Sequence, residues 1–241
     1  MDKERQTLEQ WIENAQNIVF FGGAGVSTES GIPDFRSVDG LYNQKYPWPP
    51  EEILSRDFFF SNTEEFYRFY RDKLIVHAKP NPAHLRLARL EKQGKLLAVI
   101  TQNIDGLHTA AGSKRVYELH GSIWRNHCLS CGRSMPLEEL EQTAGVPRCP
   151  ACGGLVKPDV VLYGESLDSQ VLAGAISALR RADLLIVGGT SLAVYPAAGL
   201  LQYYQGGRLV VINRDATPAD SWADLVIRNP IGRVLGEAAD G

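Results

Sequence analysis

The first stretch of this chain that could do chemistry is a glycine-rich turn directly after an apolar run at residues 18–21. The turn contains Gly22, Gly23 and Gly25. Because glycine has no Cβ, the backbone at these residues can take positive φ and can approach a pyrophosphate closely. A short helix beginning near Val26 would aim its free N–H groups at the same anion. We therefore predict a dinucleotide-binding turn, with a purely structural tight turn as the alternative.

The residues after this turn depart from the plain dehydrogenase fingerprint. Thr28 stands where that fingerprint has its third glycine, and Pro33 is expected to stop the helix after about one turn. Asp34, Phe35 and Arg36 follow directly. A carboxylate, an aromatic ring and a guanidinium have little use in a structural loop, so these three residues are candidates for binding the dinucleotide.

Small or polar side chains also follow four further apolar runs that have the pattern of buried strands, at residues 96–100, 116–119, 184–187 and 209–212. In a parallel, doubly wound sheet, ligands lie beyond the carboxyl ends of the strands. We therefore expect five strand ends to form one rim around a ligand. The candidate residues at the four further ends are Gln102, Asn103, Ile104, Asp105, His120, Gly189, Thr190, Ser191, Asn213 and Asp215.

The cysteines give a second, independent signal. Cys128-x2-Cys131 and Cys149-x2-Cys152 use all four cysteines of the chain. Their spacing is typical of a four-cysteine zinc site, and with no position left for water the zinc would be structural. A redox pair or disulfides are the alternative, which a cytosolic location disfavours.

The elements that must position these residues form an α/β pattern. Strand, helix and strand alternate, which predicts a doubly wound parallel sheet. Helical spacing of apolar residues predicts helices over residues 3–16, 63–77 and 82–93, the second of them buried almost all round in an inserted helical layer. Residues 37–50 are predicted to form a lid over the dinucleotide; a surface loop with packed aromatic side chains is the alternative.

Composition sets limits on the partners. An apolar fraction of 44% and a charged fraction of 22% are those of an ordinary soluble globule. The formal net charge of −3 argues against a dedicated nucleic-acid binder, but allows a basic peptide as partner. The first residues are too charged for a signal peptide, and no apolar run has the length of a membrane span. We therefore expect a cytoplasmic chain that binds neither nucleic acid directly nor a membrane.

Taken together, these motifs resemble the sirtuin family in its short bacterial or archaeal form, in the family's order and over nearly the whole chain. The matching segments are GAGVS at 23–27, GIPDFR at 31–36, TQNID at 101–105, HG at 120–121, the two Cys-x-x-Cys pairs, KPDVVLYGE at 157–165 and GTSL at 189–192. The resemblance implies a Rossmann-type NAD-binding domain over residues 1–36, 80–122 and 158–241. It also implies a lid loop and helical insertion over 37–79 and a four-cysteine zinc module over 123–157.

The resemblance also implies roles for single residues. Positions lining NAD are matched by Gly23, Ala24, Gly25, Thr28, Asp34, Phe35, Arg36, Gln102, His120, Gly189, Thr190, Ser191, Asn213 and Asp215. Asn103, Ile104 and Asp105 match the pocket that takes nicotinamide. His120 matches the general base, a role that suits an imidazole because it is largely neutral near pH 7.

The reaction implied is NAD-dependent removal of acetyl groups from protein lysines, giving nicotinamide and O-acetyl-ADP-ribose. The acyl oxygen of the substrate would attack the ribose as nicotinamide leaves, so free nicotinamide should inhibit by reversal. Phe35 and Val160 are expected to wall the acyl-lysine tunnel, next to His120. Residues that would pair with the substrate peptide as an added strand are Val160, Val161, Tyr163, Gly164 and Glu165.

The acyl preference rests on one departure from a branch of the family. Sirtuins that prefer acidic acyl groups carry a Tyr-x-x-Arg pair on the inserted helix, whereas here Tyr67 is followed by Tyr70. We therefore expect acetyl preference, unless Arg68 or Arg71 replaces the missing arginine. The alternatives to a deacetylase are an NAD-dependent ADP-ribosyltransferase, which uses the same activation of NAD, and a non-catalytic NAD or ADP-ribose sensor.

Overall fold

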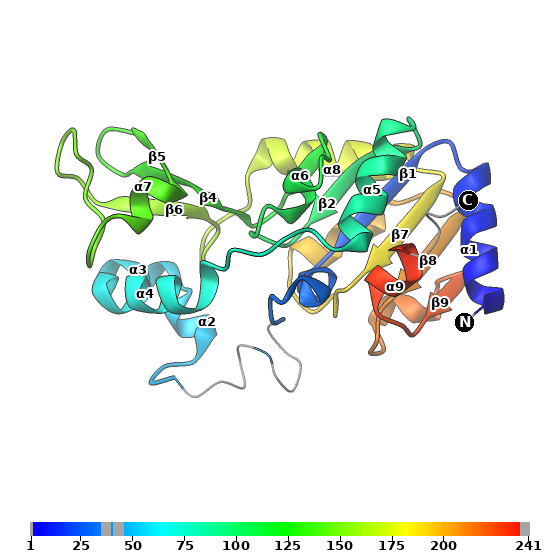
Figure 1. The fold of residues 1–241 in the computed structure, drawn as a ribbon, viewed down its shortest axis with the longest axis horizontal. Coiled ribbons are helices and arrows are strands. Elements are labelled where there is room, and N and C mark those ends of the chain that lie inside the picture. Colours follow the sequence, from blue (N-terminus) through cyan, green and yellow to red (C-terminus); the bar gives the residue numbers. More distant parts are fainter. Residues whose placement is uncertain (1, 35–39, 41–45, 237–241) are drawn as a thin grey trace.

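The computed structural model describes residues 2–34, 40 and 46–236 (Figure 1). Within these residues, the larger sheet has six strands, all parallel, in the order β3-β2-β1-β7-β8-β9. The strands are β1 Ile18–Gly22, β2 Leu96–Thr101, β3 Val116–Glu118, β7 Leu184–Gly188, β8 Arg208–Ile212 and β9 Leu225–Ile227. The order reverses between β1 and β7, and such a switch point opens a crevice at the carboxyl ends of the strands.

Helices cover both faces of this sheet, as the sequence predicts. One face is covered by α1 Asp2–Asn14, α5 Pro82–Lys92 and α9 Ile231–Gly236, and the other by α8 Ser169–Arg181 with the 3-10 segments η5 Ala197–Tyr203 and η6 Pro218–Ser221. Strand β1 contributes side chains to the hydrophobic cores on both faces of the sheet, because Phe20 packs into the first core and Phe21 into the second. The predicted doubly wound α/β fold is confirmed.

A second, smaller sheet lies at the opposite end of the molecule's long axis (Figure 1). It is antiparallel, in the order β5-β4-β6, with β4 Gly121–Cys128, β5 Ser134–Pro136 and β6 Val156–Val160. It shares a core with α7 Leu137–Glu141 and with the inserted segments α2 Pro50–Ile53, α3 Arg56–Ser61, α4 Thr63–Phe69 and η4 Tyr70–Leu74. The long strand β4 begins one residue after His120, so the small sheet is attached directly beside the rim of the large one.

The structure differs from the predicted elements in two places. The helix predicted over residues 63–77 is α-helical only to Phe69, and η4 continues it as a π-helix whose burial of Tyr70 and Leu74 completes the small core. The single short helix predicted near Val26 is instead two 3-10 turns, η1 Ala24–Val26 and η2 Thr28–Ser30.

The lid predicted over residues 37–50 lies mostly outside the described residues, and the domain boundaries stay predictions. Among the helices of the described chain, none is both long enough and apolar enough to span a membrane.

Candidate functional site

A cavity of about 570 Å³ lies at the carboxyl ends of the large sheet's strands. Its wall collects residues that follow β1, β2, β3, β7 and β8, as well as residues of the helical insertion and of the segment after β6. The predicted site residues that line it are Ala24, Gly25, Thr28, Asp34, Gln102, Asn103, Ile104, Asp105, His120, Val160, Val161, Tyr163, Gly164, Glu165, Gly189, Thr190, Ser191, Asn213 and Asp215. Gly23 is not among the lining residues, and Phe35 and Arg36 lie outside the described residues.

The glycine turn after β1 interlocks with the turn after β7. The Gly25 N–H donates to the Gly189 carbonyl at 2.8 Å, and a Cβ on Gly25 would lie 2.8 Å from the Gly189 Cα. A Cβ on Gly23 would meet Thr190 at the same distance. Positive φ occurs at Gly189, at 58°, and not at Gly22, Gly23 or Gly25, so the first turn does not use the freedom of glycine to take positive φ. Gly23 and Gly25 are required because the two turns approach each other closely, whereas a Cβ on Gly22 would meet the side chains of Phe20 and Val26.

Side chains from two other elements hold this pair of turns. The Asn81 side chain, which caps α5, donates to the Val26 carbonyl at 2.7 Å. Gln102, at the end of β2, donates to the Thr190 hydroxyl at 2.9 Å. The backbone of the predicted dinucleotide site is therefore fixed from both sides by buried or half-buried hydrogen bonds.

Ser27 joins the two polar residues of the predicted nicotinamide pocket. Its hydroxyl donates to Asp105 Oδ2 at 2.6 Å and accepts from Asn103 Nδ2 at 3.0 Å. The other carboxylate oxygen, Oδ1, accepts the Leu107 N–H at 2.9 Å. Ser27 is 1% exposed, so this network holds the Asp105 carboxylate and the Asn103 amide in one orientation at the cavity wall.

His120 lies where the two sheets meet. Its Nδ1 is 2.9 Å from the Gln102 carbonyl, which can only accept, so Nδ1 carries the proton in the neutral ring and Nε2 has a free lone pair. Burial lowers the pKa of His120 from its usual 6.5, although the hydrogen bond to Gln102 acts in the opposite direction. The ring is therefore neutral near pH 7 and able to accept a proton at Nε2.

The segment after β6 forms the opposite wall. The Val161 N–H donates to the carbonyl of His120 at 3.0 Å. The Tyr163 N–H donates to Leu54, and the Tyr163 carbonyl accepts from Arg56, each at 2.9 Å. The predicted peptide-binding edge is thus held between His120 and the helical insertion, and the chain turns at its end, where Gly164 has a φ of 89°.

The structure also shows where the possible acyl-recognition residues lie. Tyr67 and Tyr70 are fully buried in the small core. Arg68 is paired with Glu65 on the surface, and Arg71 donates to carbonyls of the loop at residues 143–145, so neither arginine lines the cavity. The cations that do line it are Lys73, whose Nζ lies 3.0 Å from the carboxylate of Asp72, and Arg214, which lies 3.7 Å from the carboxylate of Asp34.

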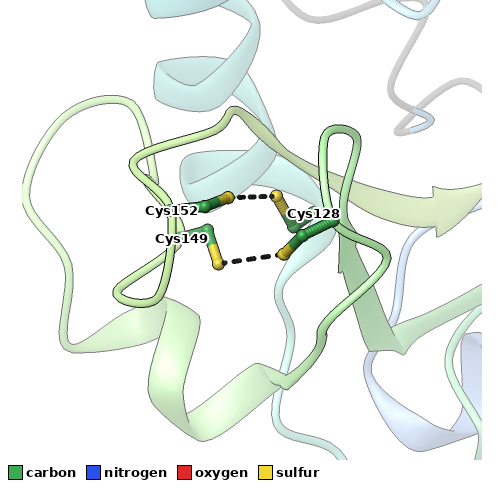
Figure 2. Close-up of side chains that lie close together, drawn as sticks. Cys128, Cys149 and Cys152 are labelled. Atoms are coloured by element: carbon green, nitrogen blue, oxygen red, sulfur yellow. Dashed lines mark hydrogen bonds between the residues drawn. The ribbon is translucent and has the colours of Figure 1, made fainter.

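The four cysteines lie together at the far end of the small sheet (Figure 2). The Sγ atoms of Cys128 and Cys152 are 3.5 Å apart, those of Cys131 and Cys149 are 3.7 Å apart, and all four lie within 4.8 Å of one another. Thiolates about 2.3 Å from a tetrahedral zinc ion would be about 3.8 Å from each other, so the arrangement fits a structural metal. It does not fit disulfides, whose sulfurs are about 2.05 Å apart.

Our sequence analysis missed several cavity residues. Ser27 stands inside the GAGVS segment that we singled out. Its role comes from its hydrogen bonds to Asn103 and Asp105, which lie 76 and 78 positions further along the chain. Asn229 follows β9, a sixth strand end, which its short run of apolar residues left unrecognised. Tyr195, beside a cis peptide bond to Pro196, also lines the cavity, and nothing in its sequence neighbourhood marked it.

Comparison with known proteins agrees with this geometry. The Sir2 family model matches residues 23–196. An NAD-dependent protein deacetylase of Clostridium perfringens is 57% identical over the full length of both chains. A protein of the same name from Clostridium acetobutylicum is also 57% identical, over 95% of each chain.

Solved Sir2 structures share the fold. One Sir2 enzyme has a TM-score of 0.89 at 41% identity, covering 98% of this chain and 96% of the other. A Sir2 variant with a deacetylated p53 peptide and 3′-O-acetyl-ADP-ribose has a TM-score of 0.89 at 39% identity, covering 97% and 98%. A complex of Sir2 with a p53 peptide and NAD+ has a TM-score of 0.84 at 41% identity, covering 95% of each chain. The sirtuin resemblance of the motifs, the geometry of the cavity and these matches lead to one conclusion: the chain belongs to the Sir2 family.

Proposed function

We propose that this chain is an NAD-dependent protein-lysine deacetylase that releases nicotinamide and O-acetyl-ADP-ribose. The observation that carries the proposal is the position of His120 between two different walls of one cavity. One wall is the pair of interlocked turns after β1 and β7, and the other is the segment that follows β6. A dinucleotide on the first wall and an acetyl-lysine peptide on the second would meet beside the free Nε2 of His120.

The first wall suits NAD as a co-substrate. Ala24, Gly25 and Thr28 would lie along the pyrophosphate, and Thr190, Ser191 and Asn213 along the ribose and adenine. Asn103 and Asp105 would bind the carboxamide of nicotinamide, because the Ser27 network fixes the direction of both side chains. Such fixed polar groups favour catalysis because they need no reorganisation as charge develops on the ribose.

His120 would act as general base. With its Nδ1 proton held by the Gln102 carbonyl, Nε2 accepts a proton from a ribose hydroxyl, which then attacks the acyl carbon. The lowered pKa keeps Nε2 available at neutral pH. The neutral acetyl-lysine side chain would reach this point between apolar groups, among them Leu54, Ile104 and Val160.

The four cysteines would hold zinc as a structural ion. Their site is built from the small sheet and its loops, and none of the four cysteines lines the cavity. The metal would therefore support the shared core of β4–β6 and the helical insertion, which carries the peptide-side wall. Thiols arranged for a metal also favour the reducing cytoplasm, where we propose the protein is located.

The experiment is mass spectrometry of an acetyl-lysine peptide with the zinc-loaded protein, with and without NAD. Acetyl loss that requires NAD, together with O-acetyl-ADP-ribose, is the expected result. NAD-dependent addition of ADP-ribose without acetyl loss would indicate a transferase instead, and NAD binding with no product would indicate a sensor. A succinyl-lysine peptide in parallel tests the acyl preference, because efficient succinyl loss would indicate that a cation of the cavity wall, Lys73 or Arg214, pairs with the acyl carboxylate.

A further inference from the structure

A buried ion pair outside the proposed chemistry ties the peptide-side wall together. Lys157 lies in β6, and its side chain is only 8% exposed. Its Nζ is 3.0 Å from Glu165 Oε2, and the Glu165 side chain is 22% exposed. A lysine is seldom buried to this degree unless it is paired, and removing one partner from such a pair is costly.

All three protons of the ammonium group have acceptors. Besides Glu165, Nζ donates to the carbonyl of Val160 at 2.9 Å and approaches that of Pro158 at 3.3 Å. The same Glu165 oxygen accepts the Leu162 N–H at 2.9 Å. Two side chains thereby connect the end of β6 to both ends of the segment at residues 160–165.

This segment is the edge on which the proposed substrate peptide would lie. It contacts His120 through the Val161 N–H, so its position also sets the distance between the peptide and the proposed base. The turns that would bind NAD have their own supports in Asn81 and Gln102. Loss of the ion pair should therefore disturb the peptide side of the cavity more than the NAD side.

We propose that Lys157 and Glu165 are positioning residues that hold the peptide-binding edge in register with His120. The proposal rests on the proposed deacetylase function for the identity of the substrate. It does not make either residue a catalytic group, because their bonds are to the chain itself. A preformed edge needs less ordering when a peptide binds, which lowers the entropic cost of binding.

The test uses the double variant K157M/E165M, because replacing both charges leaves no buried charge unpaired and often preserves stability. The expected result is a rise of about tenfold or more in the KM and Kd for an acetyl-lysine peptide, with the Kd for NAD within about twofold of the wild-type value. The single variant K157R keeps the charge and the hydrogen-bond donors. It should therefore keep most of the wild-type affinity for the peptide. The matched control is R133M/E139M, a more exposed ion pair between the residue before β5 and the helix α7, which should change neither affinity.

Two outcomes would overturn the proposal. One is a folded double variant with unchanged peptide affinity, and the other is an equal loss of peptide and NAD affinity, which would indicate a general structural role. Peptide Kd is measured by fluorescence polarisation and does not depend on turnover. A wild-type protein without deacetylase activity would therefore refute the proposed function, while the effect of K157M/E165M on peptide binding would still be read separately.

Discussion

Replacing His120 by alanine removes the imidazole whose Nε2 lone pair is free between the two walls. A positioned general base contributes about 10²- to 10⁴-fold to a rate, so we expect kcat for deacetylation to fall by that factor, or about 3–5 kcal/mol of transition-state stabilisation. The Kd for NAD should change little, because the turns that would bind NAD are held by Asn81 and Gln102. Exchange of labelled nicotinamide should persist, because nicotinamide leaves before the base is needed.

The pH profile of the wild-type protein tests the same reasoning without a mutation. The base must be neutral, and burial lowers the pKa of His120 below 6.5. The value of kcat/KM should therefore be flat near neutral pH and fall as the pH drops, with a midpoint below 6.5. Steady-state assays by liquid chromatography of the peptide would give both results. A midpoint at or above 6.5, or an alanine variant within about tenfold of wild type, would refute the general-base assignment.

Three further predictions follow from the described contacts. S27A should lower kcat by about tenfold or more, because Asp105 loses a charge-assisted hydrogen bond worth about 1.5–3 kcal/mol. The control is S30A, in the next turn. Equal kinetics for the two variants would count against a role of the Ser27 network. Removing the metal with a chelator, or replacing Cys128 by serine, should unfold the small sheet. Circular dichroism should show this as a loss of signal. Added zinc should restore the signal in the chelated wild type and not in the serine variant. Acid should destabilise the fold: burial lowers the pKa of His84 from 6.5 to about 4 and that of His108 well below 6.5. The unfolded chain then binds more protons, so stability is lost as the pH falls below 6.5, at up to about 1.4 kcal/mol per pH unit for each histidine. Urea unfolding at several pH values measures this slope, which H108Q should reduce; an unchanged slope would contradict the assignment.

The predictable part of this protein is local in sequence. Apolar runs followed by small or polar residues mark five of the strand ends, and a parallel sheet brings such ends to one edge whatever the details of packing. The four cysteines could be assigned to one metal site because the two Cys-x-x-Cys pairs have the spacing along the chain that is typical of such a site. These features were enough to predict the fold class and to bring most of the cavity's residues together.

What could not be predicted depends on contacts between distant segments. The bond from Asn81 to Val26 joins two loops through the packing of α5, and no spacing rule reveals it. The sequence suggested that glycine is needed at position 25 to make room for a ligand. In the structure, the atoms that leave no room for a Cβ on Gly25 belong to the backbone of Gly189. The π-helix at Tyr70–Leu74 follows from packing in the small core, which the helical periodicity of the same residues does not show.

The interlocked turns have a consequence for how the protein is made on the ribosome. The strand β1 and the turn after it are among the first residues synthesised, but their partners Gly188 and Gly189 come near the end of the chain. At about 5–20 residues per second, translation needs about 10–30 s to span that interval. During this time one edge of β1, a strand that is fully buried in the folded protein, has no partner, and an unpaired apolar strand edge makes a partly folded chain prone to aggregation. A chain released before residue 189 would contain the intact glycine motif and would still lack the turn after β7 against which that motif packs.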